Sequence, residues 1–259
     1  MAEQLSLRLD PALPRPGDLA PMWPVPRRDA FDDPGFLFEP TWGGHRVLAF
    51  VEPAGQSDGA GAIRLVDGRG TDWAPQLPEL AGLAVRVAAR SAVLDGELVV
   101  VDAAGRADDE ALRLRLAGRP GRAVALLVFD LLHLDGRWLL NQPLEKRRAA
   151  LRRTLRPGDE VVVVPSIAGE GRALHAAVSS QGIAGVLARR AGSPYLPGVH
   201  SRLWRSIAAS RVDPAEARPE PDEAALTGDE PGLVAAGPAA ATVLALFRRL
   251  PLDEPDTGF

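Results

Sequence analysis

Short apolar or alternating runs recur along the chain and predict β-strands. They lie at 46–51, 63–66, 92–101, 123–129, 160–165, 185–189 and 203–207, separated by turns rich in Gly, Pro and Asp. Helical periodicity falls between some of them, at 77–89, 109–117, 144–154 and 172–180. Because strands and helices do not alternate strictly, this order favours a mixed α+β architecture over a doubly wound parallel sheet.

The two ends of the chain have a different pattern. Residues 1–34 are rich in proline and charge and predict an extended lead-in, with 1–20 as a separate segment and the main domain over 21–208. Residues 209–259 read as an acidic, largely disordered tail. Within it, Val243, Leu246, Phe247 and Leu250 predict one amphipathic helix near 239–250. This helix either docks on its own core or binds a partner groove.

Composition narrows the class of protein. The 259 residues are 46% hydrophobic, enough for a sizeable core. No apolar run is long enough to cross a membrane, and the N-terminus lacks the apolar stretch of a signal peptide, so we expect a cytoplasmic protein with no membrane partner. The absence of cysteine excludes disulfides and thiolate chemistry. A net charge of −4 excludes nucleic-acid binding by bulk electrostatics and leaves room only for a local basic face.

Five motifs follow one another in the remaining sequence. The first is Phe38-Glu-Pro-Thr-Trp-Gly-Gly-His-Arg46. The others are Leu-Asp-Gly-Glu-Leu-Val at 94–99, Val-Phe-Asp-Leu-Leu-His-Leu-Asp-Gly at 128–136 with Pro-Leu-Glu-Lys-Arg-Arg at 143–148, Gly-Ile-Ala-Gly-Val-Leu-Ala-Arg-Arg at 182–190 with Ser-Pro-Tyr-x-Pro-Gly at 193–198, and Ser-Arg-Leu-Trp at 201–204.

In order and spacing these motifs resemble the adenylation (nucleotidyltransferase) domain of ATP-dependent DNA ligases, especially bacterial repair ligases, with degenerate catalytic motifs. The family's first motif reads Glu-Pro-Lys-Trp-Asp-Gly-x-Arg. The resemblance covers about residues 20–208. It implies a ligase-type nucleotidyltransferase fold, with mainly antiparallel sheets flanked by helices and a nucleotide cleft between them. We expect no C-terminal oligonucleotide-binding (OB) barrel, because the acidic tail stands in its place.

The resemblance places a threonine where the reaction needs an amine. In the family a lysine attacks the α-phosphate of ATP, and Thr41 occupies that position. A hydroxyl needs a strong adjacent base, which this motif does not offer, since its acidic position is Gly43. Lys146 is the only lysine in the sequence and is expected on a surface helix outside the pocket. The sequence therefore predicts a pseudoenzyme with no catalytic residue for self-adenylylation.

Other positions of the family pattern are only partly kept. The resemblance assigns Glu97 to ribose and metal-bound water, Phe129 to adenine stacking and Arg46 to the nucleotide. The full predicted nucleotide-binding set is Glu39, Arg46, Glu97, Phe129, Arg189 and Trp204. Ser206 and Ala208 replace the family's phosphate-binding lysines, and Ala184 replaces its second metal-binding acid.

These losses predict weak ligand binding. Each lost charge-assisted phosphate contact is worth roughly 1.5–3 kcal/mol, so ATP is expected to bind weakly or not at all. Mg²⁺ would have the Glu97 carboxylate alone and is expected to bind poorly.

The sequence leaves three functions open. The first is an inactive ligase-like protein of DNA repair and recombination that binds nucleotide or nicked DNA weakly, or recruits a repair protein through the C-terminal tail. The second is an active ligase or nucleotidyltransferase assisted by another subunit. The third is a pure protein-interaction module acting through the predicted C-terminal helix.

Overall fold

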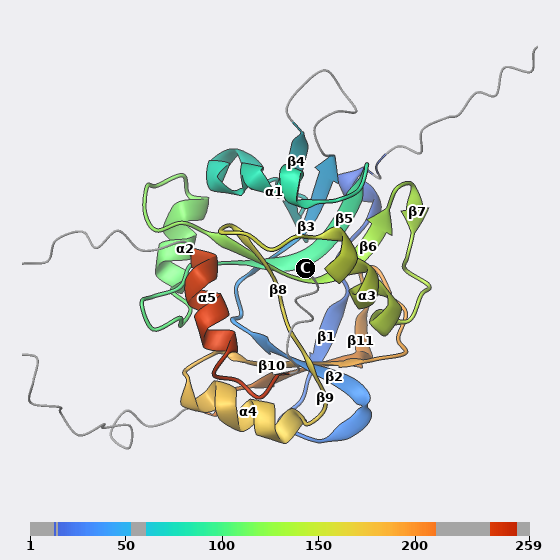
Figure 1. The fold of residues 1–259 in the computed structure, drawn as a ribbon, viewed down its shortest axis with the longest axis vertical. Helices are drawn as coiled ribbons and strands as arrows, with labels where there is room; N and C mark the ends of the chain where they lie inside the picture. Colours follow the sequence, from blue (N-terminus) through green and yellow to red (C-terminus); the bar gives the residue numbers. More distant parts are fainter. Residues whose placement is uncertain (1–12, 14, 53–60, 211–238, 253–259) are drawn as a thin grey trace, which may run out of the picture.

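Two β-sheets form the frame of the molecule (Figure 1). The computed structural model describes residues 13, 15–52, 61–210 and 239–252. Sheet A has the order β1-β11-β10-β2-β9, with strands Trp23–Pro26, His200–Ala208, Gly185–Arg190, Asp33–Thr41 and Ile167–Gly169. Sheet B has the order β4-β3-β5-β6-β7, with strands Ala62–Asp67, His45–Glu52, Ala92–Val99, Ala125–Leu134 and Arg137–Trp138, and β8 (Val161–Val163) pairs with β6.

Most strand pairs are antiparallel; β1 with β11 and β6 with β8 are parallel. Helices cover the sheets. They are α1 (Leu83–Arg86), α2 (Asp109–Leu116), α3 (Leu144–Thr154), α4 (Gly171–Ser180) and α5 (Ala239–Phe247), with 3-10 turns at Pro16–Asp18, Ala74–Gln76 and Pro78–Gly82. α4 packs on β2 and β10 of sheet A, and α3 packs on β6 of sheet B.

The prediction of an α+β fold is confirmed, with corrections to single elements. The predicted helix 77–89 is instead a 3-10 turn followed by the four-residue α1, because Gly82 in its middle weakens helix propagation. The lead-in to residue 34 contains β1 and the start of β2. The prolines that hid β1 are tolerated because it is an edge strand.

Most of the predicted N-terminal segment (1–12 and 14) and most of the predicted acidic tail (211–238 and 253–259) lie outside the described residues. Within the described part of the chain, one helix, α5, follows β11, inside the range where the amphipathic pattern placed it. No described helix is both long and apolar enough to span a bilayer.

Candidate nucleotide site

The loop between β2 and β3 is organised by one carboxylate. Glu97 Oε2 accepts hydrogen bonds from Thr41 Oγ1 at 3.2 Å and from the Gly44 amide at 3.1 Å, and Oε1 accepts from the Trp42 amide at 2.9 Å. Gly44 is required here, because a Cβ would lie 2.2 Å from the Leu98 carbonyl oxygen. The glycine and Glu97 therefore fix Thr41 and its loop against β5.

Glu97 also corrects one expectation about Thr41. The first motif itself offers no base, but the fold brings the Glu97 carboxylate to the Thr41 hydroxyl from a different strand. Burial raises the pKa of Glu97 above its ordinary value of 4.5, although the Trp42 amide, the Thr41 hydroxyl and Arg46 favour the charged form. The carboxylate that the resemblance assigned to ribose and metal-bound water is thus used to hold the loop.

Arg46 is held by a neighbouring acid on the same face of sheet B. Its Nε and Nη2 donate to the two carboxylate oxygens of Asp95, each at 2.6 Å. Burial opposes this charge, but Asp95 outweighs it and raises the pKa of Arg46. Tyr195 donates its hydroxyl to Asp95 Oδ2 at 2.7 Å and accepts from the Met22 amide at 2.9 Å. Arg46 is therefore paired within the protein.

Glu39 is the acceptor for two buried arginines. Arg189 Nη2 donates to Glu39 Oε1 at 2.5 Å, and Arg148 Nη1 donates to the same oxygen. Arg189 also reaches Asp130 Oδ2 at 3.3 Å, and Arg147 donates to both Asp130 oxygens at 2.8 and 2.9 Å. Three arginines and two acids form one buried ion cluster that joins sheet A, α3 and β6.

The two aromatic members of the predicted set lie against guanidinium groups. Phe129 has Arg46 Cζ at 4.6 Å and Arg189 Cζ at 5.0 Å from its ring centroid. Trp204 has Arg189 Cζ at 4.9 Å and packs edge-on against Tyr195. These are cation–π distances, so the rings already have charged partners of the same chain.

The structure brings the predicted residues together and encloses all of them except the half-buried Arg46. Relative exposure is 0–1% for Glu39, Arg189 and Trp204, 5% for Phe129 and 7% for Glu97. The residues that complete the enclosure were not singled out from the sequence: Asp95, Asp130, Arg147, Arg148 and Tyr195. Each lies inside or next to a quoted motif. The sequence feature that could have identified the charged ones is a charged residue within an apolar strand or on the core-facing side of a helix.

Comparison with known proteins decides the family. The sequence profile described as "ATP dependent DNA ligase domain" matches residues 29–207, more than half of the chain. The chain belongs to this family.

Among its relatives, the ligase-family chain is 36% identical over 169 residues to the multifunctional non-homologous end joining DNA repair protein LigD of Mycobacterium tuberculosis, covering 65% of this chain and 21% of that protein. The LigD of Pseudomonas aeruginosa is 32% identical over 162 residues, with 62% and 18% covered. The chain thus spans about a fifth of the length of these relatives. A solved structure, mycobacterial DNA ligase D complexed with ATP and MES, superposes with a TM-score of 0.63 and 30% identity over 74% of this chain and 60% of that one.

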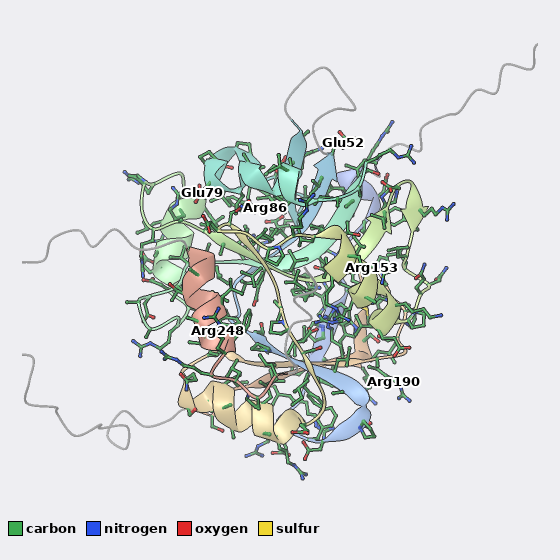
Figure 2. The ribbon with its side chains drawn as sticks, in the orientation of Figure 1. Glu52, Glu79, Arg86, Arg153, Arg190 and Arg248 are labelled. Carbon is green, nitrogen blue, oxygen red and sulfur yellow. The ribbon has the colours of Figure 1, made fainter. Side chains whose placement is uncertain are left out.

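The predicted repair-ligase type and the ligase nucleotidyltransferase fold are confirmed by these matches. The single lysine of this ligase-family chain lies away from the site. Lys146 is exposed on α3, on the opposite side of that helix from the buried ion cluster. Figure 2 labels Arg153, further along α3, and Arg190, at the end of β10. Thr41 remains half-buried at the nucleophile position.

The residues present do not fit the ligands of an active ligase. Both Glu97 oxygens already accept donors from residues 41–44, which leaves little capacity for a metal or its water. In the described part of the chain, no group of three His, Asp or Glu side chains has the geometry to hold a metal ion. Of the predicted nucleotide contacts, Glu39, Arg189 and Trp204 are enclosed by other side chains of this chain.

Proposed function

We propose that this chain is a DNA repair ligase-like domain that does not form a covalent adenylate. The observation that carries the proposal is Thr41: a hydroxyl stands at the position of the attacking amine and is hydrogen-bonded to Glu97. A neutral hydroxyl is a poor nucleophile without a strong base. Glu97 is a weak base, and it is already engaged by two backbone amides.

Weak nucleotide affinity is part of the same proposal. The phosphate-binding positions after Trp204 carry Ser206 and Ala208 in place of lysine. Losing each charge-assisted contact removes roughly 1.5–3 kcal/mol, and about 1.4 kcal/mol is a factor of ten in affinity. Adenine would also have to displace guanidinium groups that lie against Phe129.

A basic cluster supports a retained, modest affinity for nicked DNA. Arg205 of β11 has two arginine neighbours, Arg202 on the same strand and Arg27 just after β1: burial, then the charges of Arg202 and Arg27, lower the pKa of Arg205. Within the described residues, neither Arg202 nor Arg205 forms an ion pair. Like charges without acidic partners are suited to phosphate, and phosphate contacts give salt-dependent binding without sequence preference.

Adenylylation is tested by incubating the purified chain with ATP labelled at the α-phosphate and Mg²⁺, followed by denaturing electrophoresis. We expect no covalent label on the wild type or on Thr41→Lys, because the lysine alone restores neither the phosphate contacts nor an open site. A label on the wild type that Thr41→Ala abolishes would refute the proposal and identify an active nucleotidyltransferase.

Binding to DNA is tested separately with a nicked duplex at several salt concentrations. Three phosphate contacts predict a slope of log K against log salt of about −2.7, from roughly −0.9 per contact. Arg202→Ala with Arg205→Ala should reduce the slope by about two such contacts, whereas Arg113→Ala, on the exposed face of α2, should leave it unchanged. Equal slopes for all three proteins would remove DNA from the proposed function.

A further inference from the structure

The C-terminal helix α5 is amphipathic, and its apolar side is buried. Val243, Leu246, Phe247 and Leu250 are 0–8% exposed, whereas Leu244 on the same helix is 37% exposed. The buried four belong to the same core cluster as Phe129 and Trp42. α5 therefore docks on its own domain, as one of the two interpretations of its sequence pattern expected.

α5 touches the loop that carries the candidate site. The Phe247 ring packs edge-on against Trp42, with centroids 5.6 Å apart. Leu246 covers Gly105 so closely that a Cβ there would lie 2.7 Å from its Cδ1. Trp42 in turn donates its indole N–H to the Gly105 carbonyl at 2.8 Å. One face of the helix thus packs against both the donor residue, Trp42, and the acceptor residue, Gly105, of this hydrogen bond.

Further contacts connect Trp42 to the candidate site. The Trp42 amide donates to Glu97, and Glu97 holds the Thr41 hydroxyl. Val99, two residues after Glu97, lies beneath the same loop: a Cβ on Gly44 would lie 2.7 Å from Val99 Cγ1. α5 also contacts β6, the strand of Phe129, and β8 (Figure 1).

We infer that α5 is a cap built into the chain, which holds the Trp42 loop closed over Glu97 and controls access to the space between the sheets. Its docking keeps Trp42 and Val99 away from water, and its release would expose apolar surface that favours closure again. Leu246 and Phe247 are positioning residues in this scheme, since Phe247 contacts Trp42 and Leu246 packs on Gly105, whose carbonyl holds the Trp42 indole. The inference holds whether or not Thr41 reacts with a nucleotide.

The absence of cysteine allows a direct test of this cap in the full chain. Val99→Cys places one thiol beneath the loop, and Val47→Cys places one thiol in the core on the other face of sheet B, where Val47 is equally buried. Each is combined with Leu246→Ala, or with Leu244→Ala as a matched control on the exposed side of α5. The rate of reaction with a thiol reagent is measured well below the unfolding temperature.

We expect Leu246→Ala to accelerate thiol labelling in the Val99→Cys variant on the order of tenfold to hundredfold, because the region under the cap opens locally. The labelling rate of the Val47→Cys variant should stay unchanged. Leu244→Ala should change neither rate. An equal acceleration at both positions would show that α5 merely stabilises the whole domain and would overturn the inference. Unchanged rates at both positions would overturn it too. Neither result bears on covalent adenylylation.

Discussion

Replacing Glu39 by glutamine removes the one carboxylate that Arg148 and Arg189 share. Glu39 is 1% exposed, and both guanidinium groups that contact it are buried. The amide of Glu39→Gln keeps the size and one acceptor oxygen of the acid, so packing is retained while the negative charge is lost. The buried cluster then holds three arginines against Asp130 alone.

The expected loss in the free energy of unfolding follows from the buried positive charge that Glu39→Gln leaves uncompensated. Breaking a buried pair by removing one partner costs about 3–5 kcal/mol, a large share of the roughly 5–15 kcal/mol that stabilises a native domain. The glutamine oxygen keeps hydrogen-bonding capacity, so we expect about 3 kcal/mol. Burial, followed by the effect of Arg189, already lowers the pKa of Arg148 when Glu39 is present, which indicates how little further repulsion the cluster tolerates.

Urea unfolding followed by circular dichroism measures the loss. With an m value of about 2 kcal/mol/M, the midpoint should fall by about 1.5 M. Glu52→Gln is the matched control, because Glu52 is exposed at the end of β3 (Figure 2) and its charge is solvated; it should change the midpoint by less than about 0.3 M. A loss at Glu39 no larger than that at Glu52 would refute the closed ion cluster and, with it, the enclosure of the candidate site.

Three further predictions concern single groups. The raised pKa of Glu97 means that the folded state holds this proton more tightly than the unfolded state, so the wild type should lose stability relative to Glu97→Gln as pH rises above about 4.5, measured as the difference between two unfolding curves; a flat difference would contradict the burial of this carboxylate. Burial, then Asp95, raises the pKa of Tyr195, the only tyrosine, so the tyrosinate absorbance should appear only where the chain unfolds in alkali. Trp42→Phe removes the indole donor to Gly105 and should lower stability by about 1–2 kcal/mol in thermal unfolding, with Trp138→Phe at the exposed edge as control.

The central strands of sheet B and strands β10 and β11 of sheet A could be predicted from the sequence because their apolar patterning is continuous, whereas the interior strand β2 was not among the predicted strands. Sheet B strands β3, β5 and β6 and helix α3 fall where the pattern placed them. The edge strand β1 could not be read, because Pro24 and Pro26 signal a loop locally and only the pairing with β11 makes them a strand. Local pattern thus located elements that bury a face on their own and missed those that depend on a distant partner.

The sequence indicated some members of the candidate site, but neither the buried residues that enclose it nor the hydrogen bonds within it. The motifs brought Thr41, Glu97 and Phe129 into one region, as the fold confirms. No local signal shows that Glu97 would accept donors from the loop between β2 and β3, or that Arg148 would reach Glu39 across 109 residues of sequence. Such pairings depend on tertiary geometry, which spacing alone does not give.

Burial explains which family positions this chain has kept. Glu39, Phe129 and Trp204 match the family pattern and, together with Arg189, are enclosed in the ion cluster or its aromatic lining, where each side chain supports several others. The positions that depart from the family pattern with loss of its charge all have access to solvent: Thr41 and Ser206 are half-buried, while Gly43, Ala184 and Ala208 are exposed. Arg189, which stands where the family pattern has a lysine, keeps the charge and is buried.

A substitution at a solvent-accessible position leaves no buried partner unpaired, whereas one inside the cluster leaves a buried charge behind. The fold itself therefore requires the enclosed residues that match the family. Only a bound nucleotide or metal would require the family's residues at the solvent-accessible positions. In this domain the matching motifs are explained by the packing between the sheets. The solvent-accessible positions, above all Thr41, are the ones that indicate whether the adenylylation chemistry is kept. A restored adenylylation in Thr41→Lys alone would break this division, because it would show that the enclosed residues still serve a nucleotide.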